Sequence, residues 1–370
     1  MCREGDADGA GSVGPEAGNE EIMSIHGGDI YRNVGVVDFS ANCNCYGMPE
    51  EVRRAAERGV EYAECYPDPE WEALREAIAG WEGVSPEQIL CGNGASELLM
   101  VLARALCSRE TLLLCPGFYE YERALTAAGT GIRRYRLTRE NRFWPGEGFL
   151  EELEHTTADC VIFSNPNNPT GRVLAPDYLK EMVRIAQRRG IRLIVDECFL
   201  GFLAEPARYS CKAYMDDWDG LVLLGAFTKT FACAGLRIGY LIGSDKGLLE
   251  ACRLQLPAWN VSLPAACAGI AATRCGEWLR TCAANIRKER EWLRARLEEL
   301  GCELVLGEAN FLFFNAKPGL YEHCLKHNYL IRDCSNYRGL SEGWYRVCVR
   351  RRAQNEGLVR VMGLRCDERR

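Results

Sequence analysis

Short apolar runs alternate with amphipathic segments over most of this chain, and the alternation predicts a sheet covered by helices. Seven runs have the length and composition of buried strands, and turn-forming or polar residues separate them. In chain order they are QILC, TLLLC, GIRRYRL, DCVIFS, IRLIVD, GLVLLGAF and RIGYLIGS. Strands that alternate with helices pair mainly in parallel, so we expect an α/β fold with a mainly parallel seven-stranded sheet.

The pattern changes after Leu256, and the change predicts a second domain. A long amphipathic helix is expected from about Glu277 to Leu300, followed by short strands and short helices. The first residues are rich in glycine, alanine and acid, a composition typical of a disordered tail. We therefore predict a tail over residues 1–22, an N-terminal arm over 23–48, a large domain over 49–256 and a smaller C-terminal α+β domain over 257–370.

Composition and charge argue against several classes of function. Of the 370 residues 47% are hydrophobic, which suffices for a large core, and the net charge is −7. Acidic and basic residues are interspersed, so neither nucleic acid nor an anionic membrane is expected as a partner. The apolar runs are strand-sized and no signal peptide is visible, so we expect no membrane-spanning helix and a cytoplasmic protein.

Cysteine and histidine residues give no sign of a metal site. The 20 cysteines are scattered without a CxxC pair, so free thiols are expected. His323 and His327 are four residues apart and could share one face of a helix. Because no third ligand accompanies them in the sequence, we predict no metal.

The stretch LLGAFTKTFACAGLRIGY carries the strongest chemical signal. Lys229 follows a buried strand, at the sheet edge where open α/β folds place their ligands. Arg237 supplies a fixed cation that can hold a phosphate through two hydrogen bonds. A reactive amine beside such an arginine suits pyridoxal 5′-phosphate held as a Schiff base. A surface lysine and an ordinary ion-paired arginine are the alternative interpretation of these two residues alone.

Other motifs precede this stretch in an order that favours the same site. A glycine-rich turn before a helix starting near Glu97 offers backbone N–H groups to a phosphate. Phe118 in PGF can stack on a cofactor ring, and Asn168 in NNPTG can donate to its O3′ atom. Asp196 closes an apolar strand, which is costly unless the carboxylate meets a cation such as a pyridinium nitrogen. Singly, these three residues could equally be a core residue, a turn former and a helix cap.

In this order the motifs resemble those of the fold-type-I pyridoxal-phosphate enzymes of the class I/II aminotransferase superfamily, over about residues 24–370. The resemblance implies that Lys229 is the Schiff-base lysine and that Asp196 pairs with the pyridine nitrogen. It also implies that Asn168 binds O3′ and that Phe118 stacks on the ring. Tyr66 resembles the tyrosine that reaches the cofactor phosphate of the neighbouring subunit, which implies a homodimer with composite active sites. The phosphate-binding residues that the resemblance implies within the same chain are Ala95, Ser96, Thr228 and Arg237.

Three further segments are similar to the threonine-phosphate decarboxylase branch, which is close to histidinol-phosphate aminotransferase: HGGDI, DFSANCN and IRDCSNYRGLSEGWYRVCVRRRAQNEGL. This similarity implies that His26, Asn42 and Arg332 hold the substrate phosphate, so the N-terminal arm contributes to the substrate site. It also implies that Arg346 in YRVCVR grips the substrate α-carboxylate. A histidine, an amide and an arginine are suitable donors to a phosphomonoester.

Some positions depart from the superfamily pattern and leave the reaction open. Phe199 stands where a tyrosine often follows the aspartate, and Ala226 stands where aminotransferases often have a serine. Asn44-Cys45 replaces the usual asparagine-proline pair. We expect decarboxylation of a phosphorylated amino acid, either O-phospho-L-threonine in cobalamin synthesis or O-phosphoserine. The alternatives are an aminotransferase of histidinol phosphate or an aromatic amino acid, and a ligand-binding regulator without catalysis.

Overall fold

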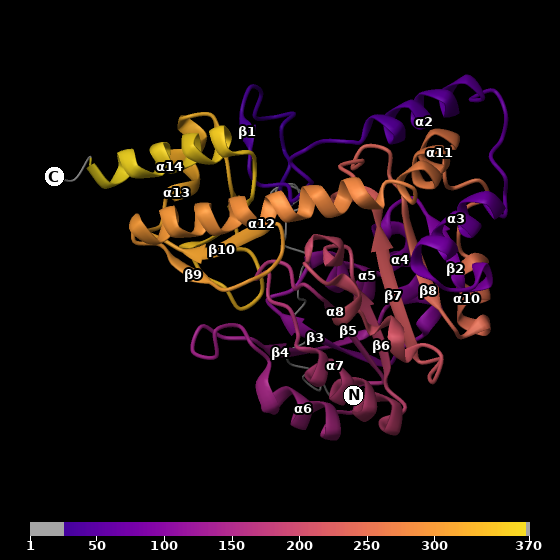
Figure 1. Cartoon of the computed structure of the whole chain (residues 1–370). Helices are drawn as coiled ribbons and strands as arrows, with labels where there is room; N and C mark the ends of the chain where they lie inside the picture. Colours follow the sequence, from indigo (N-terminus) through magenta and orange to yellow (C-terminus); the bar gives the residue numbers. More distant parts are fainter. Residues whose placement is uncertain (1–25, 368–370) are drawn as a thin grey trace, which may run out of the picture.

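The computed structural model of the protein describes residues 26–367, so the predicted tail over residues 1–22 lies outside the described part. A seven-stranded sheet forms its centre (Figure 1). The strands lie in the order β2 (Ile89–Gly92), β8 (Gly239–Gly243), β7 (Leu221–Ala226), β6 (Arg192–Asp196), β5 (Cys160–Ser164), β3 (Glu110–Cys115) and β4 (Gly131–Arg136). β8 pairs antiparallel with both of its neighbours, β2 and β7, and all other pairs in this sheet are parallel. The prediction of a mainly parallel seven-stranded sheet is therefore confirmed.

The central strands are apolar because both faces of the sheet are covered. In β3, Leu112 and Leu114 enter the core on one face, whereas Leu113 enters the core on the other. Helices α4 (Ala95–Leu106), α5 (Tyr119–Ala127) and α10 (Lys246–Arg253) contribute to the second of these cores. The first core is completed by α3 (Glu72–Glu82), α6 (Gly146–His155), α7 (Pro176–Arg189) and α11 (Leu263–Ala272).

A four-stranded antiparallel sheet forms the core of the C-terminal part. Its order is β12 (Arg332–Asp333), β13 (Trp344–Cys348), β10 (Phe311–Asn315) and β9 (Glu303–Val305). Helices α13 (Leu320–Lys326) and α14 (Arg352–Asp367) accompany it. The N-terminal arm joins this part, because β1 (Val37–Asp38) pairs in parallel with β11 (Tyr329–Leu330). Residues 37–38 of the arm thus belong to the C-terminal part of the fold, where Figure 1 shows β1.

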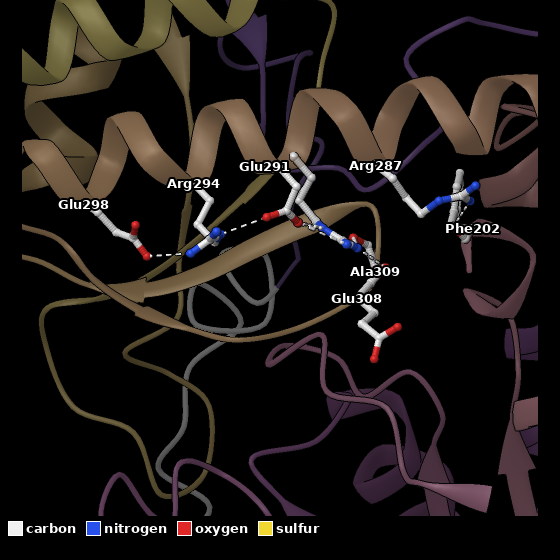
Figure 2. Close-up of polar contacts among 8 residues, drawn as sticks. Phe202, Arg287, Glu291, Arg294, Glu298, Glu308 and Ala309 are labelled. Atoms are coloured by element: carbon white, nitrogen blue, oxygen red, sulfur yellow. Dashed lines mark hydrogen bonds and ion pairs between the residues drawn. The ribbon is translucent and has the colours of Figure 1, made fainter. Parts of the chain in front are cut away.

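Helix α12 (Gly276–Glu299) joins the two parts and confirms the long helix that the sequence predicts. Its 24 residues, at about 1.5 Å each, reach from the core of the large sheet to the core of the small one. Arg287 donates to the carbonyl oxygens of Phe202 and Leu203 at 3.2 Å each (Figure 2). Arg290, one turn later, is buried and donates to the carbonyl oxygens of Glu308 and Ala309. The helix is therefore fastened to both parts by buried or partly buried arginines.

Helix α11 packs on α2 (Glu50–Glu61) rather than on the small sheet. A Cβ atom at Gly59 of α2 would lie 2.7 Å from Cα of Pro264, so only glycine permits this approach. The division at residue 256 stays a prediction, and this packing favours a boundary later in the chain. Helix α4 begins at Ala95 rather than near Glu97, because Gly94 makes the turn with a φ of +82°. The expectation of a start near Glu97 is wrong by two residues.

The cysteines and the two neighbouring histidines take structural positions. Between Cys43 and Cys348, no cysteine of the described residues takes part in a disulfide bond. His323 bonds through Nε2 to the carbonyl oxygen of Val361 at 2.8 Å, and Nδ1 of His327 lies 2.9 Å from the carbonyl oxygen of His323. Within residues 26–367, no group of three histidine, cysteine or acidic side chains is arranged to hold a metal ion. No helix in that range is both long and apolar enough to cross a membrane.

Candidate active site

A cavity of about 380 Å³ lies at the carboxyl ends of β6 and β7, between the large sheet, the arm and the small sheet. All but one of the residues predicted from the sequence line it. They are His26, Asn42, Ala95, Ser96, Phe118, Asn168, Asp196, Thr228, Lys229, Arg237, Arg332 and Arg346. The fold thus gathers residues that are up to 320 positions apart (346 − 26) around one space, although their individual roles stay predictions.

Asp196 ends β6 and is held by two hydrogen bonds. Its Oδ2 accepts from the hydroxyl of Tyr121 at 2.7 Å, and its Oδ1 accepts from the backbone N–H of Cys198 at 3.0 Å. Burial, together with the charge of Asp196, raises the pKa of Tyr121 well above its usual value, so this hydroxyl remains a donor. The carboxylate therefore keeps one orientation, which suits a partner for a ring nitrogen.

The turn between β2 and α4 makes a cradle for a phosphate. The first turn of a helix presents backbone N–H groups that have no acceptor within the helix, and Ala95 and Ser96 open α4. A Cβ atom at Gly94 would lie 2.6 Å from Nη2 of Arg237, so only glycine lets the guanidinium approach this turn. Arg237 itself has a φ of +59°, a sparsely populated conformation that is common at functional sites.

Lys229 lies in the short helix α9 (Phe227–Thr230), directly after β7. The N-terminal arm fixes this segment: the backbone N–H of Asn44 donates to the carbonyl oxygen of Lys229 at 2.9 Å, and its side chain donates to that of Thr230 at 2.9 Å. Asn44 is buried. Although Cys45 follows it in place of the usual proline, Asn44 still anchors the segment that carries Lys229.

Arg346 and Asn168 join the small sheet to the loop after β5. Nη1 of Arg346 donates to Oδ1 of Asn168, and Nη2 donates to the carbonyl oxygen of Ser40 at 2.8 Å. The guanidinium also lies over the ring of Phe311, 5.4 Å from its centroid. Its Nε is buried without a hydrogen-bond partner among the described residues, so the group retains capacity for an anion.

The three predicted phosphate-binding residues occupy neighbouring parts of the cavity wall. His26 Nε2 lies 2.9 Å from Oε1 of Glu120. Nη2 of Arg332 donates to Oδ1 of Asn336 at 2.8 Å, and its guanidinium lies 5.3 Å from the ring centroid of Tyr337. Asn42 is buried, and its Oδ1 has no hydrogen-bond partner in residues 26–367.

Tyr66 is the predicted site residue that does not reach this cavity. Its side chain is 78% exposed and stacks on Trp259, with ring centroids 4.4 Å apart. In a single chain it therefore has no contact with the cradle at α4. A role in the site of a neighbouring subunit stays a prediction.

Glu120, Tyr121, Arg123 and Tyr337 are among the cavity-lining residues that the sequence interpretation missed. Tyr121 and Phe118 are three residues apart at the start of α5, and this spacing on a helix could have indicated a shared face. Tyr337 lies in the segment that carries the decarboxylase resemblance. Its hydroxyl is 3.4 Å from Nη1 of Arg346.

Two of the departures from the superfamily pattern lie on the cavity wall. Phe199 is buried and packs edge-on against Phe311, with ring centroids 5.2 Å apart. It lines the cavity with a ring but offers no hydroxyl. Ala226 also lines the cavity, and it cannot donate to a phosphate as a serine would. Tyr121 is the tyrosine that contacts Asp196 here.

The residues around the cavity fit pyridoxal 5′-phosphate. The glycine-dependent contact between Arg237 and the turn at Gly94 forms a cradle for a dianionic phosphate. Asp196 lies on the wall where a protonated ring nitrogen needs an anion, and Lys229 supplies the amine. A pyridoxal-phosphate-dependent enzyme of fold type I is the class that this fold and this cavity define.

Comparisons with known proteins agree with this class. The chain belongs to the family of class I and II aminotransferases, which matches residues 34–362. Enzymes of this family depend on pyridoxal 5′-phosphate, which is the cofactor of this chain. Membership of the family does not by itself decide between transfer of an amino group and loss of CO₂, because both reactions use the same cofactor.

Relatives of both kinds are similar to this chain. The threonine-phosphate decarboxylase of Salmonella typhimurium is 34% identical over 92% of this chain and 96% of its own. A histidinol-phosphate aminotransferase of Archaeoglobus fulgidus is 31% identical over 89% of this chain and 100% of its own. The crystal structure of the histidinol-phosphate aminotransferase from Clostridium acetobutylicum has a TM-score of 0.82 at 26% identity, over 88% of this chain and 97% of that one.

Proposed function

We propose that this enzyme decarboxylates O-phospho-L-threonine and releases a phosphorylated amino alcohol for the side chain of cobalamin. One observation carries the proposal. Arg332 and Arg346 are direct partners on the antiparallel strands β12 and β13, and both line the cavity as buried side chains. Like charges opposite each other on paired strands are unfavourable, so such a pair is expected to bind anions.

The two arginines point toward different partners, which favours two separate anionic groups on the substrate. Arg346 reaches Asn168 and Ser40, whereas Arg332 reaches Asn336. His26 and Asn42 line the same cavity. We assign the α-carboxylate to Arg346, and the phosphate to Arg332 with His26 and Asn42.

The chemistry divides between the cofactor and the chain. When bound, the cofactor withdraws electrons from the bond between Cα and the carboxylate, so that CO₂ can leave. Asp196 would keep the ring nitrogen protonated, and Arg346 would hold the carboxylate in one orientation, since orientation relative to the ring decides which bond at Cα breaks. Lys229 lies on the cavity wall as an amine that can deliver a proton to Cα after CO₂ has left. The similarity to the Salmonella typhimurium decarboxylase supports this assignment.

Amino transfer to or from histidinol phosphate is the second candidate. The 31% identity to the Archaeoglobus fulgidus enzyme over its full length favours it. Histidinol phosphate has a phosphate but no carboxylate. In this reaction Arg346 would therefore serve only the keto acid that exchanges the amino group. The two candidates predict different products from the same substrates.

Loss of the substrate phosphate and loss of Arg332 are expected to have the same consequence. Each charge-assisted hydrogen bond to the phosphate contributes about 1.5–3 kcal/mol. Replacing O-phospho-L-threonine with L-threonine, or Arg332 with alanine, should therefore lower kcat/KM at least ~10-fold. The two losses should not add, because each removes the same interaction. Steady-state kinetics of both proteins on both compounds measures this.

Arg338→Ala is the matched control for Arg332→Ala. Arg338 follows six positions later, is 67% exposed and pairs with Glu122 outside the cavity. Its loss should leave kcat/KM within about twofold, because exposed ion pairs contribute little. Equal activity of wild-type enzyme on L-threonine and on O-phospho-L-threonine would contradict the assignment of a phosphate site.

A homodimer with composite sites is also part of the proposal. Several large hydrophobic residues are exposed at the end of α2, in the segment after it and around residues 254–259. They are Val60, Tyr62, Tyr66, Leu254 and Trp259. Exposed apolar groups of this kind are typical of an interface. We infer that a second copy covers them and that Tyr66 reaches the cofactor phosphate of that copy.

Mixing two defective variants is expected to restore activity if the sites are composite. Lys229→Ala lacks the lysine, and Tyr66→Ala lacks the residue offered to the partner. A hybrid dimer has one site with both defects and one intact site, so random mixing should restore roughly a quarter of the sites. Activity after joint unfolding and refolding, compared with separately refolded variants, measures this. Full activity of a monomer at high dilution would exclude the arrangement.

A further inference from the structure

Glu120 is a buried carboxylate in the half of the cavity that we assign to a phosphate. It is the second residue of α5 and is 6% exposed. Although burial raises its pKa, the hydrogen bond from His26 and the charge of Arg123 bring that pKa below its usual value. A carboxylate is thus held in its charged form beside a site for an anion, where it would be expected to repel the ligand.

Two basic side chains contact Glu120, one at each carboxylate oxygen. Nε2 of His26 lies 2.9 Å from Oε1, and Nη1 of Arg123 lies 3.1 Å from Oε2. The His26 side chain is 48% exposed and that of Arg123 is 57% exposed, whereas all three residues line the cavity. Glu120 is therefore the buried centre of this cluster, and it contacts two more exposed basic side chains at the cavity.

The backbone next to His26 is fixed as well. A Cβ atom at Gly27 would lie 2.4 Å from the carbonyl oxygen of Ser40, and the N–H of Gly28 donates to Oγ of Ser40 at 2.7 Å. The same carbonyl oxygen of Ser40 accepts from Arg346 at 2.8 Å. Residues 26–28 of the arm are thus held by two contacts, one with Ser40 farther along the arm and one with Glu120.

We propose that Glu120 is a positioning residue that holds His26 and Arg123 toward the substrate phosphate, and that Arg123 is a further residue that determines specificity for a phosphorylated substrate. With Arg332, the charges then match the ligand. Arg123 and Arg332 supply two positive charges and Glu120 removes one, and a His26 that takes up a proton would raise the total to match a phosphate dianion. This inference rests on the proposed function only in that the substrate carries a phosphate.

Neutralising Glu120 should change phosphate binding in opposite directions, depending on whether Glu120 positions the basic side chains or is only an anion near the phosphate. If Glu120 were merely an anion near the phosphate, its neutralisation would strengthen phosphate binding, because like charges repel. If it positions His26 and Arg123, its neutralisation releases both exposed side chains and weakens binding. The substitution Glu120→Gln keeps the size of the side chain and removes the charge.

The test is the dissociation constant of O-phospho-L-threonine, measured by rapid-mixing absorbance on the cofactor-loaded enzyme before turnover. Arg123→Gln should raise the dissociation constant of O-phospho-L-threonine at least ~10-fold, and Glu120→Gln should raise it at least ~3-fold. Neither substitution should change the dissociation constant of L-threonine. The double variant should resemble Arg123→Gln rather than the product of the two effects. Tighter binding by Glu120→Gln, or equal loss for both ligands, would overturn the proposal.

Two matched variants control for damage to the fold. Glu122→Gln removes a carboxylate of the same helix that pairs with Arg134 and Arg338 outside the cavity. Arg133→Gln removes an arginine that pairs with Glu110 on the edge of the sheet. Both should bind O-phospho-L-threonine as the wild-type enzyme does. If Glu122→Gln weakens binding as much as Glu120→Gln, a specific role for Glu120 is excluded.

The measurement also separates this inference from the proposed reaction. Preferential binding of O-phospho-L-threonine without release of CO₂ would reject the decarboxylation and leave the inference standing. Release of CO₂ with unaltered binding in both Glu120→Gln and Arg123→Gln would reject the inference alone. A wild-type enzyme that binds L-threonine as tightly as its phosphate ester would reject both.

Discussion

Replacing Lys229 with alanine is expected to abolish turnover and covalent attachment of the cofactor. Lys229 lines the cavity and lies in α9, directly after β7. Without its amine the cofactor has no covalent link to the chain and Cα has no nearby proton donor. Absorbance of the Schiff base, mass spectrometry after borohydride reduction, and CO₂ release measure the two losses.

Lys180→Ala is a suitable control for that experiment. Lys180 lies on the exposed surface of α7, so its loss should change neither the absorbance nor the rate. Addition of a small amine to Lys229→Ala tests whether the missing group can be supplied from solution. Unassisted turnover by Lys229→Ala at more than a trace of the wild-type rate would refute the role of this lysine.

Replacing Asp196 with asparagine is expected to lower kcat about 10²–10³-fold and to change KM much less. A loss of this size is comparable with the removal of one group that stabilises charge in a transition state. Asparagine keeps the shape of the side chain but cannot keep the ring nitrogen protonated. The change therefore affects the chemical step rather than the binding of the substrate. Single-turnover kinetics separates the two steps.

Tyr121→Phe should give a smaller loss with the same character. It removes the hydrogen bond to Oδ2 of Asp196 but leaves the charge, so a reduction of kcat of ~10-fold is expected from the energy of one hydrogen bond to a charged group. Asp159→Asn, at a half-buried ion pair with Arg109 outside the cavity, is the control and should leave kcat unchanged. Near-normal kcat in Asp196→Asn would show that its assigned role is wrong.

Much of the fold follows from the sequence because buried strands have a simple signature. Apart from the edge strand β4, the strands of the large sheet are covered on both faces, so they appear as continuous apolar runs ended by turn residues. The reversed direction of β8 has no such signature, because its residues are as apolar as those of its parallel neighbours. The position of α11 was equally hard to predict, since its small residues give little contrast between its faces.

Cavity residues that belong to a sequence motif could be predicted. Cavity residues that are brought there only by tertiary contacts were missed. Asp196 and Lys229 stand at strand ends, and their positions in the sequence already indicate the ligand edge of the sheet. Glu120 and Arg123 lie on a helix beside other charged residues, and the sequence gives no reason to separate them from a solvated face. Their importance arises from His26, which is 94 positions away (120 − 26) and approaches Glu120 only in the folded chain.

Tyr66 illustrates a different limit. Its predicted role requires a second subunit, and a single chain leaves its ring exposed against Trp259. Neither the sequence nor one folded chain can bring together a site that two chains build. The hybrid-dimer experiment addresses this contact directly.

The most direct test of the proposed reaction is to incubate the cofactor-loaded enzyme with O-phospho-L-threonine and measure CO₂ release and amino transfer to 2-oxoglutarate side by side. Histidinol phosphate, O-phosphoserine, an aromatic amino acid and L-threonine complete the panel. We expect one CO₂ for each O-phospho-L-threonine consumed, a phosphorylated amino alcohol as product, and little amino transfer. Amino transfer from histidinol phosphate or the aromatic amino acid, without CO₂ from any phosphorylated amino acid, would contradict the account.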